Sequence, residues 1–165
     1  MYTEIGRVLL FHYARIKQKD FNNIIFDKNI SLEHLMPQKI ESGNEDGDWW
    51  IEHLGININT IRKNYTDCIG NYGLLSVGTN SINSNLKWPK KREIIADNAL
   101  HEETKKVAES ETWNEKNIVE RNDSLSAVLA QYITGPKEEE KNNPNWILRR
   151  TNKGREQEKK TAEDK

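Results

Sequence analysis

Hydrophobic residues recur at helical spacing near the start of the chain, over residues 4–18. The basic residues of this segment lie mostly off the hydrophobic stripe, which consists of Ile5, Val8, Leu9, Tyr13 and Ile16. Apolar side chains three and four positions apart share one face of an α-helix. The pattern therefore predicts an amphipathic helix over residues 4–18.

Two short segments further along have the pattern of β-strands. Residues 29–36 alternate briefly between polar and apolar side chains until Pro37 stops the pattern, so we expect a short strand ending near His34. A glycine-punctuated apolar stretch favours a second strand around Leu74 and Leu75. The chain thus mixes strands with helices.

The segments around these strands favour turns and helices. Residues 41–48 have turn chemistry throughout, and a helix capped by Asp48 is expected to open at Trp49. Residues 80–86 and 89–100 also read as helices, with a break near residue 88 and a proline at the first position of the second helix.

The last strong helical pattern follows Thr112, which stands three residues before Glu115, a spacing typical of a capping box. Its hydrophobic stripe comprises Ile118, Leu125, Leu129 and Tyr132. The residues after position 134 are nearly all charged or amide-bearing, interrupted only by Trp146–Leu148, and bury too little to fold alone. We expect one folded domain over residues 1–134 and a charged, flexible tail over residues 135–165.

Composition narrows the classes of function. The formal net charge is -1, so contact with DNA requires a local basic patch or a partner subunit. With Cys68 as the only cysteine, the chain holds neither a disulfide framework nor a Cys-rich zinc site. No apolar run approaches the roughly 20 residues that a membrane span needs. We expect a soluble, cytoplasmic protein without membrane contact.

Candidate chemistry centres on Glu33 and His34. Phosphodiester cleavage needs a base for the attacking water and a Lewis acid at the phosphate. His34 is the natural base, because an imidazole with an ordinary pKa of about 6.5 accepts a proton near neutral pH. Glu33 and Asn80 offer the oxygen ligands that Mg²⁺ or Mn²⁺ prefers. Adjacent strand residues point to opposite faces, so convergence requires the strand to bend or end, which Pro37 favours.

Four segments, in their order and spacing, resemble one known family. They are Leu32–Gln38, Ile69–Leu75, Asn80–Asn85 and Lys90–Arg92. Together they closely resemble the HNH domain of GmrSD-type restriction endonucleases, and residues 113–121 look like that family's C-terminal helix. The resemblance spans residues 5–133. Tyr72 and Gly73 stand where the family commonly has Leu and Thr, a difference that affects packing more than chemistry.

The resemblance implies a mainly helical α+β domain built around a ββα-metal element, also called an HNH or His-Me finger element. His34 would end the first strand as the base, while Glu33 and Asn80 would bind the metal. Asn71, near the second strand, would belong to the catalytic site. An asparagine after a glycine also suits a left-handed turn, so in the alternative interpretation Asn71 orients the loop.

Several other polar residues leave alternatives open. Asn83 and Asn85 compete with Asn80 for the ligand role if the helix starts later than expected. The densest basic run in the ordered part is expected either to bind DNA phosphates or to form a solvated face. This run consists of Lys87, Lys90, Lys91 and Arg92.

The tryptophans and the remaining histidines receive no chemical role. Trp88 is expected in the core rather than stacked on a base, because tryptophan buries a large apolar area. The same interpretation holds for Trp49, Trp50 and Trp113. Three further histidines lack a flanking ligand pattern, namely His12, His53 and His101.

These observations lead to one functional hypothesis and one rival. The first is a DNA endonuclease domain that uses Mg²⁺ or Mn²⁺ to hydrolyse or nick phosphodiester bonds. The resemblance further implies a role in restriction and antiviral defence, with an NTP-dependent sensor module, fused or separate, as partner. The rival is a non-catalytic nucleic-acid-binding or assembly module on the same fold.

Overall fold

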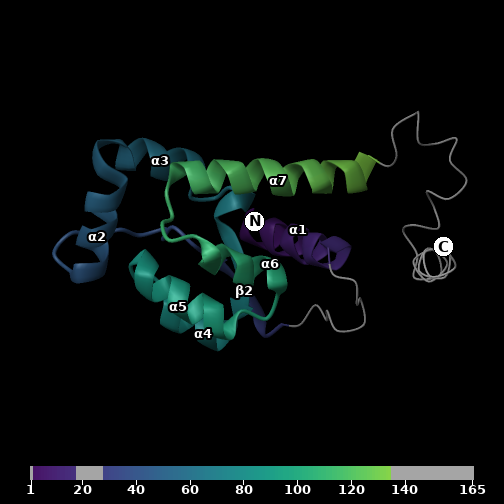
Figure 1. The fold of residues 1–165 in the computed structure, drawn as a ribbon, viewed down its shortest axis with the longest axis horizontal. Coiled ribbons are helices and arrows are strands. Elements are labelled where there is room, and N and C mark those ends of the chain that lie inside the picture. Colours follow the sequence, from purple (N-terminus) through teal and green to yellow (C-terminus); the bar gives the residue numbers. More distant parts are fainter. Residues whose placement is uncertain (1, 18–27, 135–165) are drawn as a thin grey trace, which may run out of the picture. The chain divides into compact units, whose positions relative to one another are not determined.

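The computed structural model describes residues 2–17 and 28–134, and the predicted charged tail lies outside them. The chain divides into two units, Met1–Leu129 and Ala130–Lys165, and only the end of one helix is described in the second. The first unit is mainly helical around one small sheet (Figure 1). The predicted α+β class is confirmed at this level.

The sheet is a pair of antiparallel strands, β1 (Ile30–His34) and β2 (Tyr72–Ser76). Both predicted strands are thereby confirmed. The register sets Glu33 opposite Gly73 and His34 opposite Tyr72. Helix α4 (Val77–Asn83) follows β2 without a connecting loop and contacts β1. It starts three residues before the predicted helix, because the side chain of Ser76 caps it by accepting from the Thr79 N–H at 3.1 Å.

The segment between the strands holds two helices that the turn-rich sequence partly concealed. Helix α2 (Glu45–Leu54) begins four residues earlier than predicted, because Asn44 rather than Asp48 caps it. The Asn44 side chain accepts from the Gly47 N–H at 2.9 Å. The short 3-10 turn η2 (Gly55–Asn57) leads into α3 (Ile58–Tyr65), and a second turn, η3 (Ile69–Asn71), precedes β2.

Four further elements follow α4 in the described part of the chain. They are α5 (Trp88–Asn98), α6 (Glu102–Lys105), η4 (Lys106–Glu109) and α7 (Glu115–Thr134). The break before α5 and the proline in its first turn are confirmed. Thr112 does not cap α7, however, because the side chain of Asn114 accepts from the backbone N–H groups of Lys116 and Asn117. None of the described helices has the length and apolar character needed to cross a membrane.

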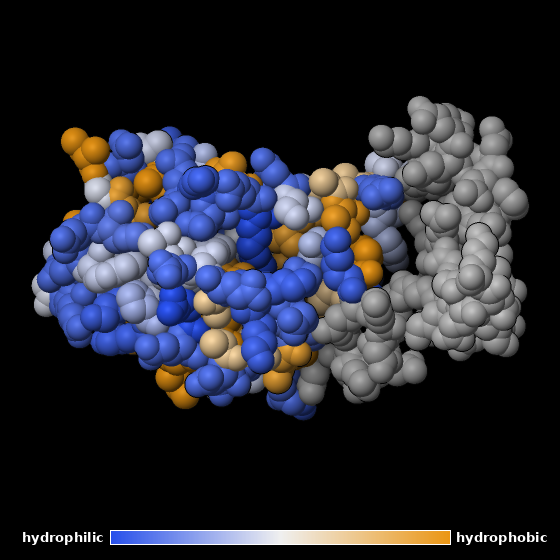
Figure 2. All heavy atoms as spheres, viewed as in Figure 1, coloured by the Kyte–Doolittle hydropathy of each residue, from blue (hydrophilic) through white to orange (hydrophobic). Residues whose placement is uncertain are grey.

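The strands separate two hydrophobic clusters. Leu74 packs with α1 (Tyr2–Lys17) and α7, whereas the next residue, Leu75, packs with a tryptophan-rich cluster. That cluster includes Trp50, Trp88 and Trp113, all nearly or fully buried as predicted, with Trp49 packed against it. The face drawn in Figure 2 is mostly hydrophilic, with scattered hydrophobic side chains. The two-stranded sheet is therefore supported from both faces, which fixes the residues at the end of β1.

Candidate functional site

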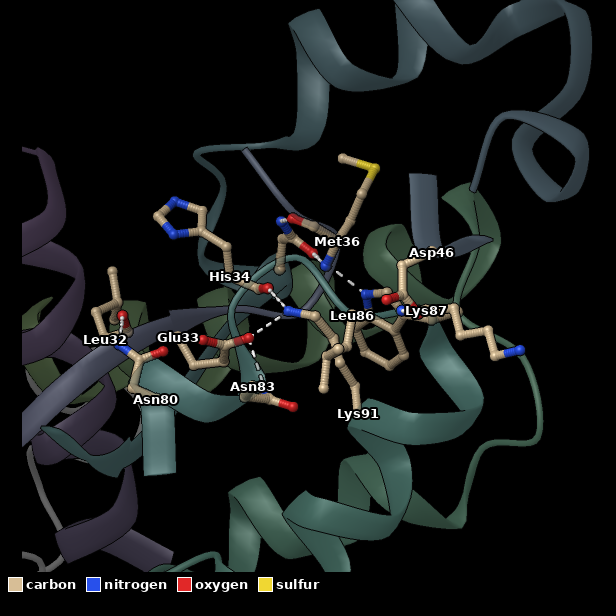
Figure 3. A network of polar contacts seen from close by, with 12 residues as sticks. Leu32, Glu33, His34, Met36, Asp46, Asn80, Asn83, Leu86, Lys87 and Lys91 are labelled. Atoms are coloured by element: carbon tan, nitrogen blue, oxygen red, sulfur yellow. Dashed lines mark hydrogen bonds and ion pairs between the residues drawn. The ribbon is translucent and has the colours of Figure 1, made fainter. Parts of the chain in front are cut away.

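The two central residues of the predicted site point in different directions. Glu33 and His34 are the last two residues of β1, and consecutive strand residues face opposite sides of a sheet. Glu33 points toward Asn83 and Lys91, whereas the imidazole of His34 points away from them (Figure 3). The structure therefore brings Glu33, Asn80, Asn83 and Lys91 together and leaves His34 with other partners.

Glu33 is the centre of a buried polar cluster, which we call the Glu33 cluster and define as Glu33, Asn83 and Lys91. The Lys91 ammonium forms an ion pair with Oε1 of Glu33 and donates to the His34 carbonyl oxygen at 2.7 Å. The side-chain amide of Asn83 donates to the same Oε1 at 2.9 Å. Glu33 is 3% exposed, while Lys91 and Asn83 are fully buried.

Burial acts on both charged groups of this cluster. Desolvation raises the pKa of Glu33, and Lys91 and Asn83 oppose that rise through charge and hydrogen bonds. Desolvation lowers the pKa of Lys91, opposed by Glu33. With one proton held between the carboxyl and the amine, the cluster carries no net charge, whichever group has the proton. The net charge of the Glu33 cluster is therefore zero both for the ion pair and for the neutral pair.

Two oxygens beside the cluster suit a cation. Asn80 donates its amide hydrogens to Oγ of Ser31 at 2.8 Å and to the Leu32 carbonyl at 3.0 Å, which leaves its amide oxygen without a donor among the described residues. Figure 3 shows this oxygen and the second carboxylate oxygen of Glu33 turned toward each other. Two facing acceptors repel unless a cation or a water lies between them. The pair fits an oxygen-ligated divalent ion such as Mg²⁺.

This donor set is small. No group of three or more His, Cys, Asp and Glu side chains able to hold a metal occurs among the described residues. Asn83 turns its amide nitrogen to Glu33, while its own oxygen is buried without a partner and points away from Glu33 (Figure 3). Asn85 is exposed. Asn80 is thus the asparagine that presents an oxygen next to Glu33.

On the other face, His34 pairs with a residue that the sequence did not single out. Its Nε2 lies 3.0 Å from Oδ1 of Asp67, an exposed residue before η3, and Tyr72 donates to the same oxygen at 3.3 Å. Burial lowers the pKa of His34, and Asp67 opposes this. Because a carboxylate only accepts hydrogen bonds, the N–H of neutral His34 belongs on Nε2, leaving Nδ1 to accept a proton. No motif or spacing in the sequence marks Asp67.

Asn71 uses all its polar atoms to hold the chain. Its Oδ1 accepts from the Met36 N–H at 2.7 Å and from the Trp113 indole at 3.2 Å. Its amide donates at 3.0 Å to the carbonyls of Met36 and Thr66. The side chain is fully buried. These contacts support the interpretation in which Asn71 orients the loop, and they leave no polar atom for a substrate.

The basic run does not form one surface. Lys87 and Lys90 form ion pairs with Glu45, and Lys90 also pairs with Asp46, so acidic residues of α2 balance their charges. The sequence groups Lys91 with this run, yet the structure places it inside the Glu33 cluster, where it is closed to DNA phosphates. Arg92 is half-buried and forms no ion pair within the described part of the chain.

Comparison with known protein families identifies the class. The model of the family described as "GmrSD restriction endonucleases, C-terminal domain" matches residues 3–128. The chain belongs to this family, which confirms the resemblance noted in the sequence. Neither the curated proteins nor the solved structures contain a match. The family assignment gives the chain a nuclease role in restriction, with DNA as substrate.

Proposed function

We propose that this chain is an HNH-type DNA endonuclease domain that depends on a divalent metal ion, Mg²⁺ or Mn²⁺. The observation that carries the proposal is the order β1, β2, α4 in a restriction endonuclease family, with Glu33 and His34 ending β1 and Asn80 on α4 against it. We propose that this order is the ββα element that the family resemblance implies.

In the proposed reaction each residue has a defined task. Glu33 and Asn80 hold the metal, which, when bound, supplies a Lewis acid for the phosphate. His34 takes a proton from the attacking water at Nδ1, while the water oxygen forms the new bond to phosphorus. The bond from phosphorus to the leaving sugar oxygen breaks, and that oxygen takes a proton from solvent. Asp67 is a positioning residue that keeps the N–H of His34 on Nε2.

The two faces of β1 are compatible with action on one phosphate. Because Glu33 and His34 are the last residues of the strand, a phosphate beyond the strand end would have the carboxylate on one side and the imidazole on the other. Asn71 supports this end by holding Met36, two residues further along, onto the segment before β2. We assign no direct chemistry to Asn71.

The proposed setting is a restriction and antiviral defence system in the cytoplasm. We propose an NTP-dependent sensor module, fused or separate, as the partner that brings this nuclease to DNA. Its support is electrostatic: the chain has a formal net charge of -1, and acidic neighbours balance Lys87 and Lys90. A chain with no net positive charge gains little affinity from phosphates alone.

A plasmid assay tests the assignment. Purified protein with Mg²⁺ or Mn²⁺ is expected to nick supercoiled plasmid, and chelation is expected to stop it. His34→Ala should lower the rate about 100-fold or more, because a general base contributes on the order of 10² to 10⁴. His12→Ala, a histidine change outside the site, is the matched control. Equal nicking by His34→Ala would overturn the assignment of His34 as the base, and no metal-dependent nicking by the wild-type protein would favour the non-catalytic binding module.

A further inference from the structure

The Lys91 ammonium lies beside the carboxylate that the proposed metal would need. We propose that the metal site is incomplete in the free protein, that Lys91 keeps it so by neutralising Glu33, and that a DNA phosphate completes it. Metal and DNA then bind cooperatively. This inference rests on the proposed function and concerns the regulation of the same site.

The first support is the permanence of the pair. Lys91 is fully buried and Glu33 nearly so, and the ammonium is held both by the carboxylate and by the His34 carbonyl oxygen. A buried ammonium has no water to replace these partners. Lys91 is therefore a fixed neighbour of Glu33, unlike Lys90, the other lysine of α5, whose side chain is 41% exposed.

The second support is a count of charges. Glu33 contributes one negative charge, Lys91 cancels it, and the amides of Asn80 and Asn83 add none, so a divalent cation would enter a neutral and largely buried site. Such a site gives the cation no attraction to offset the loss of its water. Asp67 does not supply the missing negative charge, because it lies with His34 on the opposite face of β1.

The third support is the set of ligands. The protein offers two oxygens, one from Glu33 and one from Asn80, and neither is shut off from solvent like the buried oxygen of Asn83. Mg²⁺ loses water reluctantly and is usually held by one or two carboxylates together with phosphates of the substrate. A DNA phosphate supplies both the missing oxygen ligands and the missing negative charge.

Direct measurement of Mn²⁺ binding tests the proposal without relying on cleavage. Free Mn²⁺ is followed by electron paramagnetic resonance with the full chain carrying His34→Ala, so that a short DNA duplex stays intact. The same measurement with His34→Ala/Glu33→Gln gives the Mn²⁺ held by the duplex alone. We expect the Glu33-dependent site to bind Mn²⁺ at least tenfold more tightly with DNA than without it. By linkage, Mn²⁺ should raise the affinity for the duplex by the same factor.

A separate Mn²⁺-binding measurement tests the role of Lys91. In the absence of DNA, Lys91→Met is expected to raise the affinity for Mn²⁺ at least tenfold, because the carboxylate of Glu33 is then unpaired. Lys106→Met is the matched control, since it removes a half-exposed lysine whose one ion pair among the described residues is with Glu103. If Lys91→Met does not fold, as judged by circular dichroism, the comparison with and without DNA decides the proposal alone.

The possible outcomes distinguish a failure of metal–DNA cooperativity from a failure of the proposed metal site itself. Equal Mn²⁺ affinity with and without DNA would overturn this inference and leave the proposed metal site standing. An unchanged Mn²⁺ affinity in folded Lys91→Met would overturn the role of Lys91. No Glu33-dependent Mn²⁺ in any arm, the duplex included, would overturn the metal-dependent function itself and this inference with it.

Discussion

The two faces of β1 present consecutive residues to opposite environments. Glu33 is closed in, with a buried ammonium as partner, whereas His34 pairs with Asp67, whose side chain is 56% exposed. On the first face the charges are matched within a buried cluster; on the second the carboxylate partner of His34 faces solvent. The difference teaches that two residues adjacent in the sequence can have opposite environments at one strand end, and in the proposed mechanism one of them holds the metal while the other moves a proton.

The largest effect, a loss of folding stability, is expected from breaking the buried ion pair between Lys91 and Glu33. Lys91→Met leaves the carboxylate of Glu33 buried without a counter-charge, and such a loss lowers the free energy of unfolding by about 3–5 kcal/mol. Urea unfolding followed by circular dichroism measures it. The double variant Glu33→Gln/Lys91→Met removes both charges and should recover most of the loss. An equal loss in the double variant would show that packing, and not charge, matters at Lys91.

On the face of β1 that carries His34, the expected effect is on the rate of nicking. Asp67→Ala should lower kcat for nicking about tenfold, because His34 loses the partner that fixes its N–H on Nε2. KM and the melting temperature should stay unchanged, since the Asp67 side chain is exposed. Asp67→Asn keeps an acceptor for Nε2 and should recover most of the rate. A fall in melting temperature that accounts for the lost activity would contradict a positioning role.

The buried imidazole of His101 tests how burial without a hydrogen-bond partner affects the pH dependence of stability. His101 is 5% exposed, both its ring nitrogens are buried without a hydrogen bond to any described residue, and burial lowers its pKa. Below pH 6.5, its ordinary value, the unfolded chain therefore binds a proton that the folded chain refuses, so stability falls as pH decreases toward the lower folded value. Above pH 6.5 both states are neutral and the contribution vanishes.

The matching variant is His101→Leu. Urea unfolding at pH 7.5 and pH 5.5 should show a smaller loss of stability on acidification than in the wild-type chain. His34 and His53 also have lowered pKa values from burial, so some loss will remain. An identical loss in both proteins would mean that His101 has no part in the acid sensitivity.

The smallest effect concerns the exposed ion pairs. Glu45→Gln removes the carboxylate that pairs with both Lys87 and Lys90, while Lys90 keeps its ion pair with Asp46. The change should strengthen binding of a DNA duplex about twofold at low salt, with the gain disappearing as salt rises. Fluorescence anisotropy of a labelled duplex measures this, with Glu41→Gln as the matched control. No gain at low salt would place the DNA-binding surface elsewhere.

Much of the fold follows from the hydrophobic pattern, because the strands and the long helices bury regular stripes. The helix starts were harder to predict, because turn-forming residues also cap helices: Asn44 begins α2 inside a segment that reads as a turn. At the site, the sequence indicated Glu33, His34 and Asn80. Asp67 and the pairing of Lys91 escaped prediction, since each contact joins residues more than 30 positions apart.

The register of β1 and β2 limits where members of this family can vary in length. Leu74 and Leu75 of β2 belong to different cores, and Glu33 and His34 of β1 face different sides, so one residue inserted or deleted within either strand would exchange the environments of that strand's pair. Changes of length are therefore expected to accumulate in the exposed stretch around Ser42 and Gly43, and surviving relatives should keep the strands free of gaps.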